Sequence, residues 1–334
     1  MNTEEARLLS PQVNSLESKS EQSLRPKKLS EFIGQKPVVS NIEVMIHSAL
    51  KRSSALDHVL LSGPPGLGKT SLAYVIAHNL GSNIHCISGP ALEKKGDLAA
   101  LLTNLSARDI LFIDEIHRMP IAIEEILYSA MEDYRIDIVI GQGASSRTMS
   151  INLEPFTLIA ATTRPGMLSN PLRDRFIAHL HFDFYEERDL KIILKHNAIK
   201  VGIALDDDAL DMMAKCSRGT PRIANRLLRR VRDFSIYNDR NAICLEDVNE
   251  TLLMLQIDQA GLDRMDRKIL NVILDYYGGG PVGIEALCAT LSEDRETIED
   301  VYEPYLLKEG YLIRTPRGRE CSTRGREHIL RLQN

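Results

Sequence analysis

Gly63-Pro-Pro-Gly-Leu-Gly-Lys-Thr70 is the stretch that decides the fold of this chain. It follows an apolar run at residues 58–61 and precedes a helix-patterned segment at residues 71–77. Glycines let consecutive backbone N–H groups turn inward around an anion, and the N-terminus of the following helix adds the positive end of its dipole. The stretch therefore predicts a strand, loop and helix that cradle the phosphates of a nucleoside triphosphate.

The residues that close this loop have defined chemistry, and a second segment complements them. Lys69 is predicted to reach the outer phosphates, and Thr70 to ligate Mg²⁺ through its hydroxyl. The apolar run at residues 110–113 leads into Asp114 and Glu115, at the carboxyl end of the sheet, where open α/β proteins bind ligands. We expect Asp114 to hold the Mg²⁺ shell and Glu115 to polarise the attacking water, which predicts a hydrolase.

Other predicted strands and segments supply a polar sensor and two arginines. The run at residues 157–161 ends at Thr162, which is expected to sense the γ-phosphate; the alternative is a strand-ending threonine that caps the next turn. Arginine neutralises charge that spreads over a transferred phosphoryl group. Arg175 is expected on the far side of its domain from the loop and so to reach a neighbouring subunit, whereas Arg222 closes onto its own nucleotide. A ring or filament with heterologous contacts would follow.

Composition narrows the class of protein. The chain has 334 residues, of which 43% are hydrophobic and 26% charged, which predicts two or three domains with sizeable cores. A formal net charge of -5 excludes coating of nucleic acid by global charge alone. Five scattered cysteines without a C-x-x-C pair favour a reducing compartment. Without a signal peptide or a run of about 20 apolar residues, a cytoplasmic protein with no membrane contact is expected.

Hydrophobic patterning divides the chain into four parts. Residues 1–23 are polar and predict a flexible tail. Residues 24–185 alternate strand and helix patterns, which predicts a large ATPase domain of α/β class with a parallel sheet. Residues 186–257 predict a small all-helical domain, and residues 258–334 a winged-helix domain that binds DNA. Strands of the parallel sheet are expected at residues 59–61, 84–87, 110–113, 157–161 and 179–184.

Two strands around a glycine-containing loop interrupt the α/β pattern. Residues 135–140 and 148–153 predict an inserted hairpin in which apolar and polar side chains alternate. Its apolar face packs either into the core of its own domain or against a partner protein. The sequence leaves both alternatives open.

Arginines are concentrated in two places. Arg218, Arg226 and Arg230 share an i,i+4 stripe with Arg222, and we expect a solvated helix face for them. In the last domain, helices are expected at residues 283–291 and 295–309, followed by a ribbon at residues 310–322. Arg314 and Arg319 on that ribbon are the candidates for contacting DNA phosphates or the minor groove, and Arg295 is a weaker one.

Several longer segments of the chain match known sequence motifs. They lie at residues 25–35, 63–70, 112–118, 161–164, 171–176, 219–222, 297–306 and 314–319. The ATPase motifs alone are typical of all AAA+ proteins, whereas the segments Thr-Ile-Glu-Asp-Val-Tyr-Glu-Pro-Tyr-Leu and Arg-Thr-Pro-Arg-Gly-Arg in the last domain are more specific. Together these segments resemble the RuvB family, the bacterial Holliday-junction branch-migration motors of the AAA+ class.

The resemblance implies an ATP- and Mg²⁺-dependent homohexameric ring that moves duplex DNA. It implies that RuvA binds the hairpin between Ile136 and Leu153, and that RuvC joins the complex to cut the junction. Arg175 becomes a finger that acts in trans and Arg222 a sensor that acts in cis. The nucleotide-binding residues it implies are Leu24, Arg25, Gly66, Lys69, Thr70, Ser71, Glu132, Asp133, Tyr134, Arg175, Tyr185 and Arg222.

Two other functions share part of this pattern. A clamp loader or initiator has the same loop, acidic pair and arginine finger, but does not move a junction. A nucleotide-switched winged-helix regulator binds ATP without rapid turnover, and replacement of Glu115 separates that function from a hydrolase.

Overall fold

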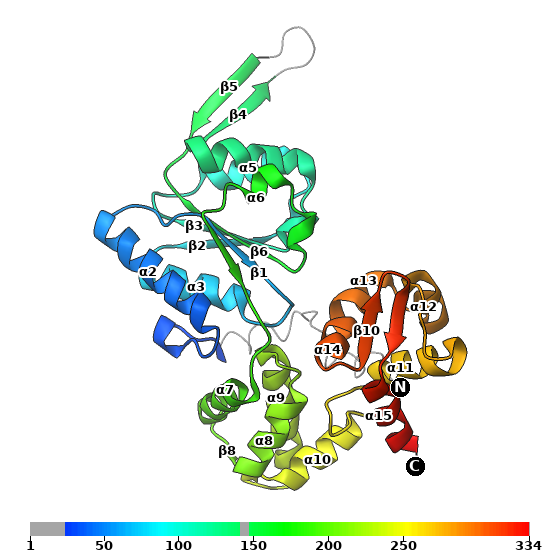
Figure 1. Cartoon of the computed structure of the whole chain (residues 1–334). Coiled ribbons are helices and arrows are strands. Elements are labelled where there is room, and N and C mark those ends of the chain that lie inside the picture. Colours follow the sequence, from blue (N-terminus) through cyan, green and yellow to red (C-terminus); the bar gives the residue numbers. More distant parts are fainter. Residues whose placement is uncertain (1–23, 141–146, 334) are drawn as a thin grey trace. The chain divides into compact units, whose positions relative to one another are not determined.

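The computed structural model describes residues 24–140 and 147–333 of the chain (Figure 1). The predicted tail, residues 1–23, lies outside the described residues, and so does the tip of the predicted hairpin at residues 141–146. The described residues form two compact units. The first unit comprises residues 25–63 and 67–183, and the second comprises Leu24, residues 64–66 and the chain from Phe184 onward.

A parallel five-stranded sheet is the centre of the first unit, as predicted. Its order is β2-β3-β6-β1-β7, so the strand that precedes the glycine-rich loop lies between β6 and β7. Strand β7 ends at His181, three residues before its predicted end. The strands are β1 (Val59–Ser62), β2 (Ile84–Ser88), β3 (Ile110–Asp114), β6 (Thr157–Thr162) and β7 (Ala178–His181).

Helices cover both faces of this sheet, which is why β6 is buried along its whole length and β3 is buried up to Asp114. Helices α2 (Lys36–Arg52) and α3 (Lys69–Leu80) lie on one side (Figure 1). The other side carries α4 (Lys95–Thr103), α5 (Ile121–Asp133) and α6 (Asn170–Arg173), whose apolar side chains share one core with alternate residues of β1, β3 and β6. Short 3-10 turns occur at Leu29–Glu31, Gly89–Ala91, Ile116–Arg118 and Pro165–Met167.

The predicted hairpin is present and projects beyond α5 (Figure 1). Strands β4 (Arg135–Ile140) and β5 (Arg147–Asn152) pair antiparallel. At the root of the hairpin, Ile136 and Leu153 are buried in the core of the first unit. Farther along β5, Met149 is 49% exposed. Packing into the domain core therefore accounts for the root of the hairpin and does not cover Met149.

The chain after Phe184 begins with a helical lid. Its helices are α7 (Glu187–Lys200), α8 (Asp207–Cys216), α9 (Pro221–Tyr237) and α10 (Leu245–Met254). The prediction of an all-helical domain holds apart from a two-residue parallel bridge between β8 (Ala204–Leu205) and β9 (Ala242–Ile243). β8 follows α7 and β9 follows α9, and these two helices pack against each other. The two short segments therefore lie side by side, and their backbone N–H and C=O groups pair with each other.

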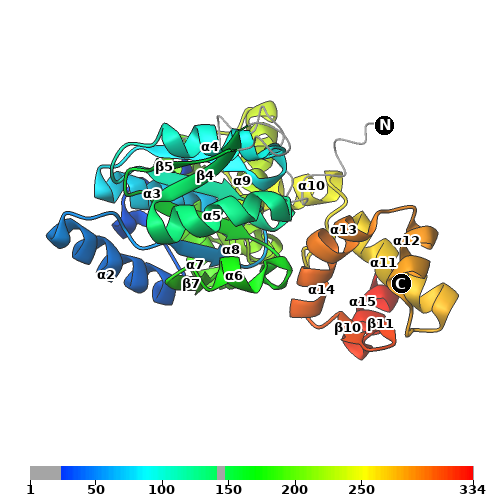
Figure 2. The ribbon, with the colours of Figure 1, turned by 90° about the horizontal axis from the view of Figure 1, so that it is seen from above.

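A winged helix completes the second unit (Figure 2). The ribbon forms where predicted, but the helix expected at residues 295–309 is interrupted by a π-helical turn, Ile298–Tyr302. Pro304 has no N–H to donate to the carbonyl of Asp300, and Glu303 N–H instead bonds Ile298, five residues back. The remaining elements are α11 (Arg264–Tyr277), α12 (Ile284–Leu291), α13 (Arg295–Thr297), α14 (Glu303–Lys308), β10 (Leu312–Thr315), β11 (Gly318–Cys321) and α15 (Thr323–Gln333).

The prediction that the arginine stripe faces solvent is wrong at two positions. Arg218 is 2% exposed and Arg226 is 4% exposed, whereas Arg230 is exposed as predicted. The i,i+4 spacing identifies residues that share a face, but the neighbouring elements decide whether that face meets solvent. None of the helices in the described residues is both long and apolar enough to span a bilayer.

Candidate nucleotide-binding and DNA-binding sites

The glycine-rich loop has the backbone that a phosphate cradle needs. Gly63, Gly66 and Gly68 have φ of 131°, 80° and 100°, a region that side-chain-bearing residues rarely adopt. A Cβ at Gly63 would collide with the carbonyl oxygen of Phe182. Helix α3 begins at Lys69, whose buried Nζ donates a 2.7 Å hydrogen bond to the carbonyl of Gly63. The loop is thus folded around its own lysine at the helix N-terminus.

Thr70 and Asp114 form an oxygen pair next to this loop. The Thr70 hydroxyl donates to Oδ2 of Asp114 over 3.2 Å. Asp114 ends β3, and Thr70 lies in the first turn of α3, so the carboxyl edge of the sheet brings them together. Hydroxyl and carboxylate oxygens are the ligands that Mg²⁺ prefers. The two side chains fit an Mg²⁺ ion at the position that the sequence predicts.

Glu115 diverges from Asp114 because the backbone turns sharply between them. Glu115 has φ of 50°, in the left-handed region, so its side chain leaves the direction of the strand. The carboxylate accepts a 3.3 Å hydrogen bond from the hydroxyl of Thr163 and lies 3.3 Å from Nδ1 of His117. The carboxylate is therefore held at the end of β6 as well as at the end of its own strand.

His117 links Glu115 to Thr162, a contact that the sequence analysis missed. Nδ1 of His117 lies 3.0 Å from the hydroxyl of Thr162, a fully buried side chain that ends β6. Thr162 also accepts a hydrogen bond from the backbone N–H of Arg164, so the capping role weighed as the alternative is present too. The position of His117, two residues after Glu115, was the available signal.

Arg175 is held by its own domain. Its guanidinium donates to the carboxylate of Glu132 over 2.8 Å and to the carbonyl of Pro171 over 2.7 Å. The guanidinium also stacks on the ring of Tyr128, with 4.8 Å between Cζ and the ring centroid. The structure thus brings together Arg175 and Glu132, two residues predicted separately for the nucleotide.

Arg175 lies at the opposite edge of the sheet from Asp114. Strand β7 begins three residues after Arg175, so this arginine is at the amino ends of the parallel strands. Asp114 and Thr162 end their strands and lie at the carboxyl edge. The fold therefore keeps Arg175 away from the glycine-rich loop of the same chain.

The remaining predicted nucleotide residues in the first unit lie on several elements. Arg25 stacks on Tyr74 of α3 at 5.4 Å, and Ser71 is in the first turn of the same helix. At the end of α5, Asp133 lies 3.6 Å from Arg135, and Tyr134 adopts a left-handed conformation.

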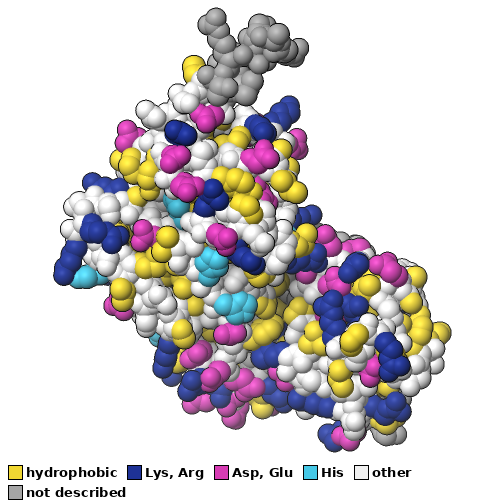
Figure 3. Space-filling view, turned by 45° about the horizontal axis from the view of Figure 1, so that its top comes forward, with side chains coloured by type: hydrophobic (Ala, Val, Ile, Leu, Met, Phe, Trp, Pro, Cys, Tyr) yellow, Lys and Arg dark blue, Asp and Glu magenta, His cyan; other side chains and the backbone are white. Residues whose placement is uncertain are grey.

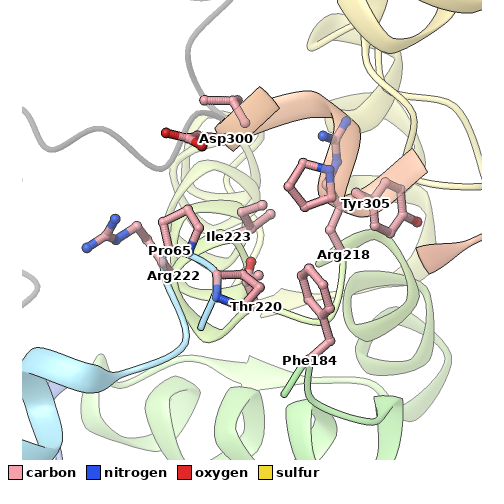
Figure 4. A pocket seen from close by; sticks show the side chains of 12 residues that line it. Pro65, Phe184, Arg218, Thr220, Arg222, Ile223, Asp300 and Tyr305 are labelled. Atoms are coloured by element: carbon pink, nitrogen blue, oxygen red, sulfur yellow. The ribbon is translucent and has the colours of Figure 1, made fainter. Parts of the chain in front are cut away.

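The predicted residues of the second unit gather around the turn before α9. Tyr185 is buried and its N–H donates to the carbonyl of Gly219 over 2.8 Å. The N–H of Arg222 lies 3.3 Å from the carbonyl of Gly66. The carbonyl of Leu24 accepts a hydrogen bond from Lys200. A pocket opens beside this turn and is lined by Pro65, Phe184, Arg218, Thr220, Arg222, Ile223, Asp300 and Tyr305, among others (Figure 4).

Arg314 and Arg319 occupy different environments on the wing. The Arg314 side chain is 54% exposed and lies 3.4 Å from Glu299. The Arg319 side chain is 7% exposed and pairs with Glu299 at 2.9 Å and with Glu303. Partial burial of Glu299 is outweighed by hydrogen bonds from Arg295 and Arg319, so the pKa of Glu299 is lowered. Figure 3 shows Lys and Arg side chains interspersed with acidic ones on the winged-helix surface.

A parallel-sheet P-loop domain, a helical lid and a winged helix define an AAA+ nucleotide-binding protein of the kind that works on DNA. Three family models match this chain in order. They are the Holliday junction DNA helicase RuvB P-loop domain at residues 24–182, the RuvB AAA lid domain at residues 185–258 and the RuvB C-terminal winged helix domain at residues 259–330. The chain belongs to the RuvB family.

Curated relatives and solved structures agree with this family. The Holliday junction branch migration complex subunit RuvB of Myxococcus xanthus is 57% identical over 91% of this chain and 89% of its own. The subunit of the same name from Staphylococcus aureus strain JH9 is 50% identical over 97% of each chain. The solved structure of the Thermotoga maritima RuvB Holliday junction branch migration motor is 50% identical, with a TM-score of 0.85 over 92% of this chain and 99% of that one.

Proposed function

We propose that this chain hydrolyses ATP and uses the energy to drive branch migration of Holliday junctions in homologous recombination and DNA repair. The observation that carries the proposal is the meeting of Thr70, Asp114 and Glu115 at the carboxyl edge of a sheet, in a chain that ends in a winged helix. The names of the curated relatives support the same activity.

Each residue at this edge has a role that its position supports. The loop amides and Lys69 bind the phosphates, and Thr70 and Asp114 hold Mg²⁺. The ion, when bound, neutralises charge on the β- and γ-phosphate oxygens. Glu115 accepts a hydrogen bond from the attacking water and orients it, and Thr162 contacts the γ-phosphate.

The active assembly is proposed to be a homohexameric ring. Arg175 lies at the sheet edge opposite its own loop, which supports a role in trans at the nucleotide of a neighbouring subunit. Arg222 acts in cis from the lid. Contacts between different surfaces of identical subunits close into a ring when the rotation permits.

Each domain is proposed to contact a different partner. We propose the boundaries 24–185, 186–257 and 258–334 for the large ATPase, lid and winged-helix domains, which the ranges of the three family models support. The winged helix contacts duplex DNA through Arg314 and Arg295, whose side chains are exposed. Arg319, the third candidate, is 7% exposed and pairs with Glu299 and Glu303, so it supports this surface from within the domain. The exposed part of the β4–β5 hairpin binds RuvA, and RuvC joins the same complex.

A four-way junction with two mobile arms tests the proposal. Purified chain, ATP, Mg²⁺ and RuvA are expected to move the crossover, and omission of RuvA or ATP to stop it. Glu115→Gln is expected to abolish steady-state hydrolysis and movement while ATP binding, measured by equilibrium titration, persists. Movement by Glu115→Gln at the unmodified rate would contradict the assignment of this carboxylate. Rapid ATP turnover without junction movement would contradict the proposed function.

A further inference from the structure

Arg218 reaches from the lid into the winged-helix domain. It comes directly before the turn Gly219-Thr-Pro-Arg222, and only 2% of the residue is exposed. Its Nε donates to the carbonyl of Gly261 over 2.9 Å, and its guanidinium stacks on the ring of Tyr305 at 4.9 Å. Figure 4 shows Arg218 and Tyr305 next to each other at the pocket that Arg222 also lines.

Arg218 forms ion pairs with two acidic residues at the start of α11. Its Nη2 pairs with the fully buried carboxylate of Asp266 and lies 3.4 Å from that of Asp263. Asp263 caps α11 by accepting from the N–H groups of Met265 and Asp266, and Asp266 accepts in return from the N–H of Asp263. The guanidinium is thus bound to the capped end of a helix, which is a rigid part of the winged-helix domain.

The turn at residues 219–222, which follows Arg218 and leads into α9, is held by several contacts. Thr220 donates to the carbonyl of Ser217 through both its N–H, at 2.9 Å, and its hydroxyl, at 3.1 Å. Pro221 fixes its own φ and starts α9. Gly219 has φ of 69°, and a Cβ there would lie 2.8 Å from Nζ of Lys308 in α14. Arg218 and Arg222 are thus joined by a short turn that these hydrogen bonds and Pro221 hold in one conformation.

Stabilising the contact between the lid and the winged-helix domain does not by itself require a buried ion pair. Nη1 of Arg218 and Oδ1 of Asp266 are buried without a hydrogen-bond partner. Buried ion pairs are often replaced by apolar residues without loss of stability, because removing charges from water is costly. A directional guanidinium contact fixes the angle between the parts that it joins, which an apolar contact does not.

We propose that Arg218 is a positioning residue that couples Arg222 to the winged-helix domain, so that the nucleotide state sets the orientation of α11. The proposal rests on the proposed function, in which Arg222 contacts the nucleotide and the winged helix contacts DNA. It assigns the coupling to the contacts of Arg218 with Asp263, Asp266 and Tyr305.

Conservative variants in the full-length chain test the coupling. Arg218→Lys keeps the charge and loses the planar fork. The double variant Arg218→Met with Asp266→Leu replaces the pair by apolar side chains. The remaining carboxylate, that of Asp263, still accepts from the N–H groups of Met265 and of the substituted residue 266 at the start of α11. Arg230→Lys, on the exposed side of the same lid, is the matched control. The readout is the ratio of duplex-DNA affinities with a non-hydrolysable ATP analogue and with ADP, together with the stimulation of ATPase by DNA.

Allosteric couplings are typically about 5- to 150-fold. The ratio is expected to fall to within about twofold of one in both Arg218 variants, while binding of the ATP analogue and basal ATPase remain, and to stay unchanged in Arg230→Lys. If the double variant folds and its ratio of duplex-DNA affinities equals that of the unmodified protein, Arg218 only stabilises the contact between the two domains. That result would overturn the proposal.

Hydrogen exchange of the unmodified protein provides a test that no variant can spoil by misfolding. Binding of the ATP analogue is expected to slow exchange at residues 219–222 and to change it at residues 258–267. Protection confined to residues 219–222 would overturn the coupling. Failure of the proposed function is distinguishable, because the unmodified protein would then show no DNA stimulation of ATPase.

Discussion

The hydroxyl of Thr70 lies 3.2 Å from Oδ2 of Asp114, although 44 residues separate them in the chain. The contact exists because α3 begins, and β3 ends, at the carboxyl edge of one parallel sheet. Neither residue alone makes a Mg²⁺ site, since a cation of this kind needs several oxygen ligands at fixed positions. The geometry of this pair carries the assignment of the nucleotide site.

Removing one oxygen of the pair should raise the Mg²⁺ requirement. Thr70→Val keeps the shape of the side chain and deletes its hydroxyl, so the ATPase rate is expected to fall and to need a higher Mg²⁺ concentration. The measurement is the steady-state rate across a Mg²⁺ titration. Thr103→Val is the matched control, because that hydroxyl donates to the backbone carbonyls of Ala99 and Ala100 within α4. An identical Mg²⁺ dependence in Thr70→Val would argue against the metal site.

Mixed assemblies should show whether Arg175 acts in trans. Subunits with Arg175→Ala and subunits with Lys69→Ala are each expected to be inactive, since each lacks one half of an interface. Mixing them builds some interfaces that contain both an intact Lys69 and an intact Arg175, so ATPase activity should partly return. The rate is measured over a series of mixing ratios, with each variant alone as the reference. No recovery at any ratio would contradict the role in trans.

Arg314 and Arg319 should respond differently to truncation. Arg319→Ala leaves Glu303, which is 1% exposed, without its main partner, and is expected to destabilise the winged helix by about 3–5 kcal/mol. Arg314→Ala removes an exposed side chain, and a change in stability below about 1 kcal/mol is expected. Thermal unfolding of the two variants measures this difference.

Measurements of DNA binding test the role of Arg314. If Arg314 contacts a phosphate, Arg314→Ala weakens binding similarly for all sequences and lowers the salt slope by about one unit. Affinities for several duplexes at a series of salt concentrations provide the measurement. A loss that depends on the duplex sequence would indicate base contacts instead.

His58 should make the stability of the P-loop domain depend on pH. Burial lowers the pKa of His58 below its ordinary 6.5, against the raising effects of the carbonyl of Met131 and of Asp57. Nδ1 accepts the N–H of Leu158 over 2.9 Å, so the neutral ring fits the fold. The unfolded chain then binds more protons than the folded one below pH 6.5, and stability is lost as the pH falls through that value.

Denaturant unfolding between pH 5 and 8 measures this dependence. His58→Asn keeps an acceptor beside Leu158 and cannot titrate, so its stability curve is expected to be flatter with pH than that of the unmodified chain. Equal slopes in the two proteins would show that another group is responsible.

Local sequence was enough for the α/β class, the phosphate loop and the positions of the strands along the chain. Gly63, Lys69 and Thr70 act through backbone turns and a helix start that neighbouring residues dictate. The five strands were predicted because their apolar runs are short and bounded, although the end of β7 was placed three residues too late. The hairpin was predicted for the same reason, from alternation along the chain.

Tertiary structure alone decided where the charged side chains lie. By sequence, Arg218 belongs to an exposed stripe and Arg319 to a DNA-facing wing, yet both are nearly buried against carboxylates. Arg218 and Asp266 are 48 residues apart, and no local pattern records that they meet. The physical reason is that propensity and motif spacing depend on adjacent residues, whereas the burial of a charge depends on which distant partner the packed elements bring within reach of it.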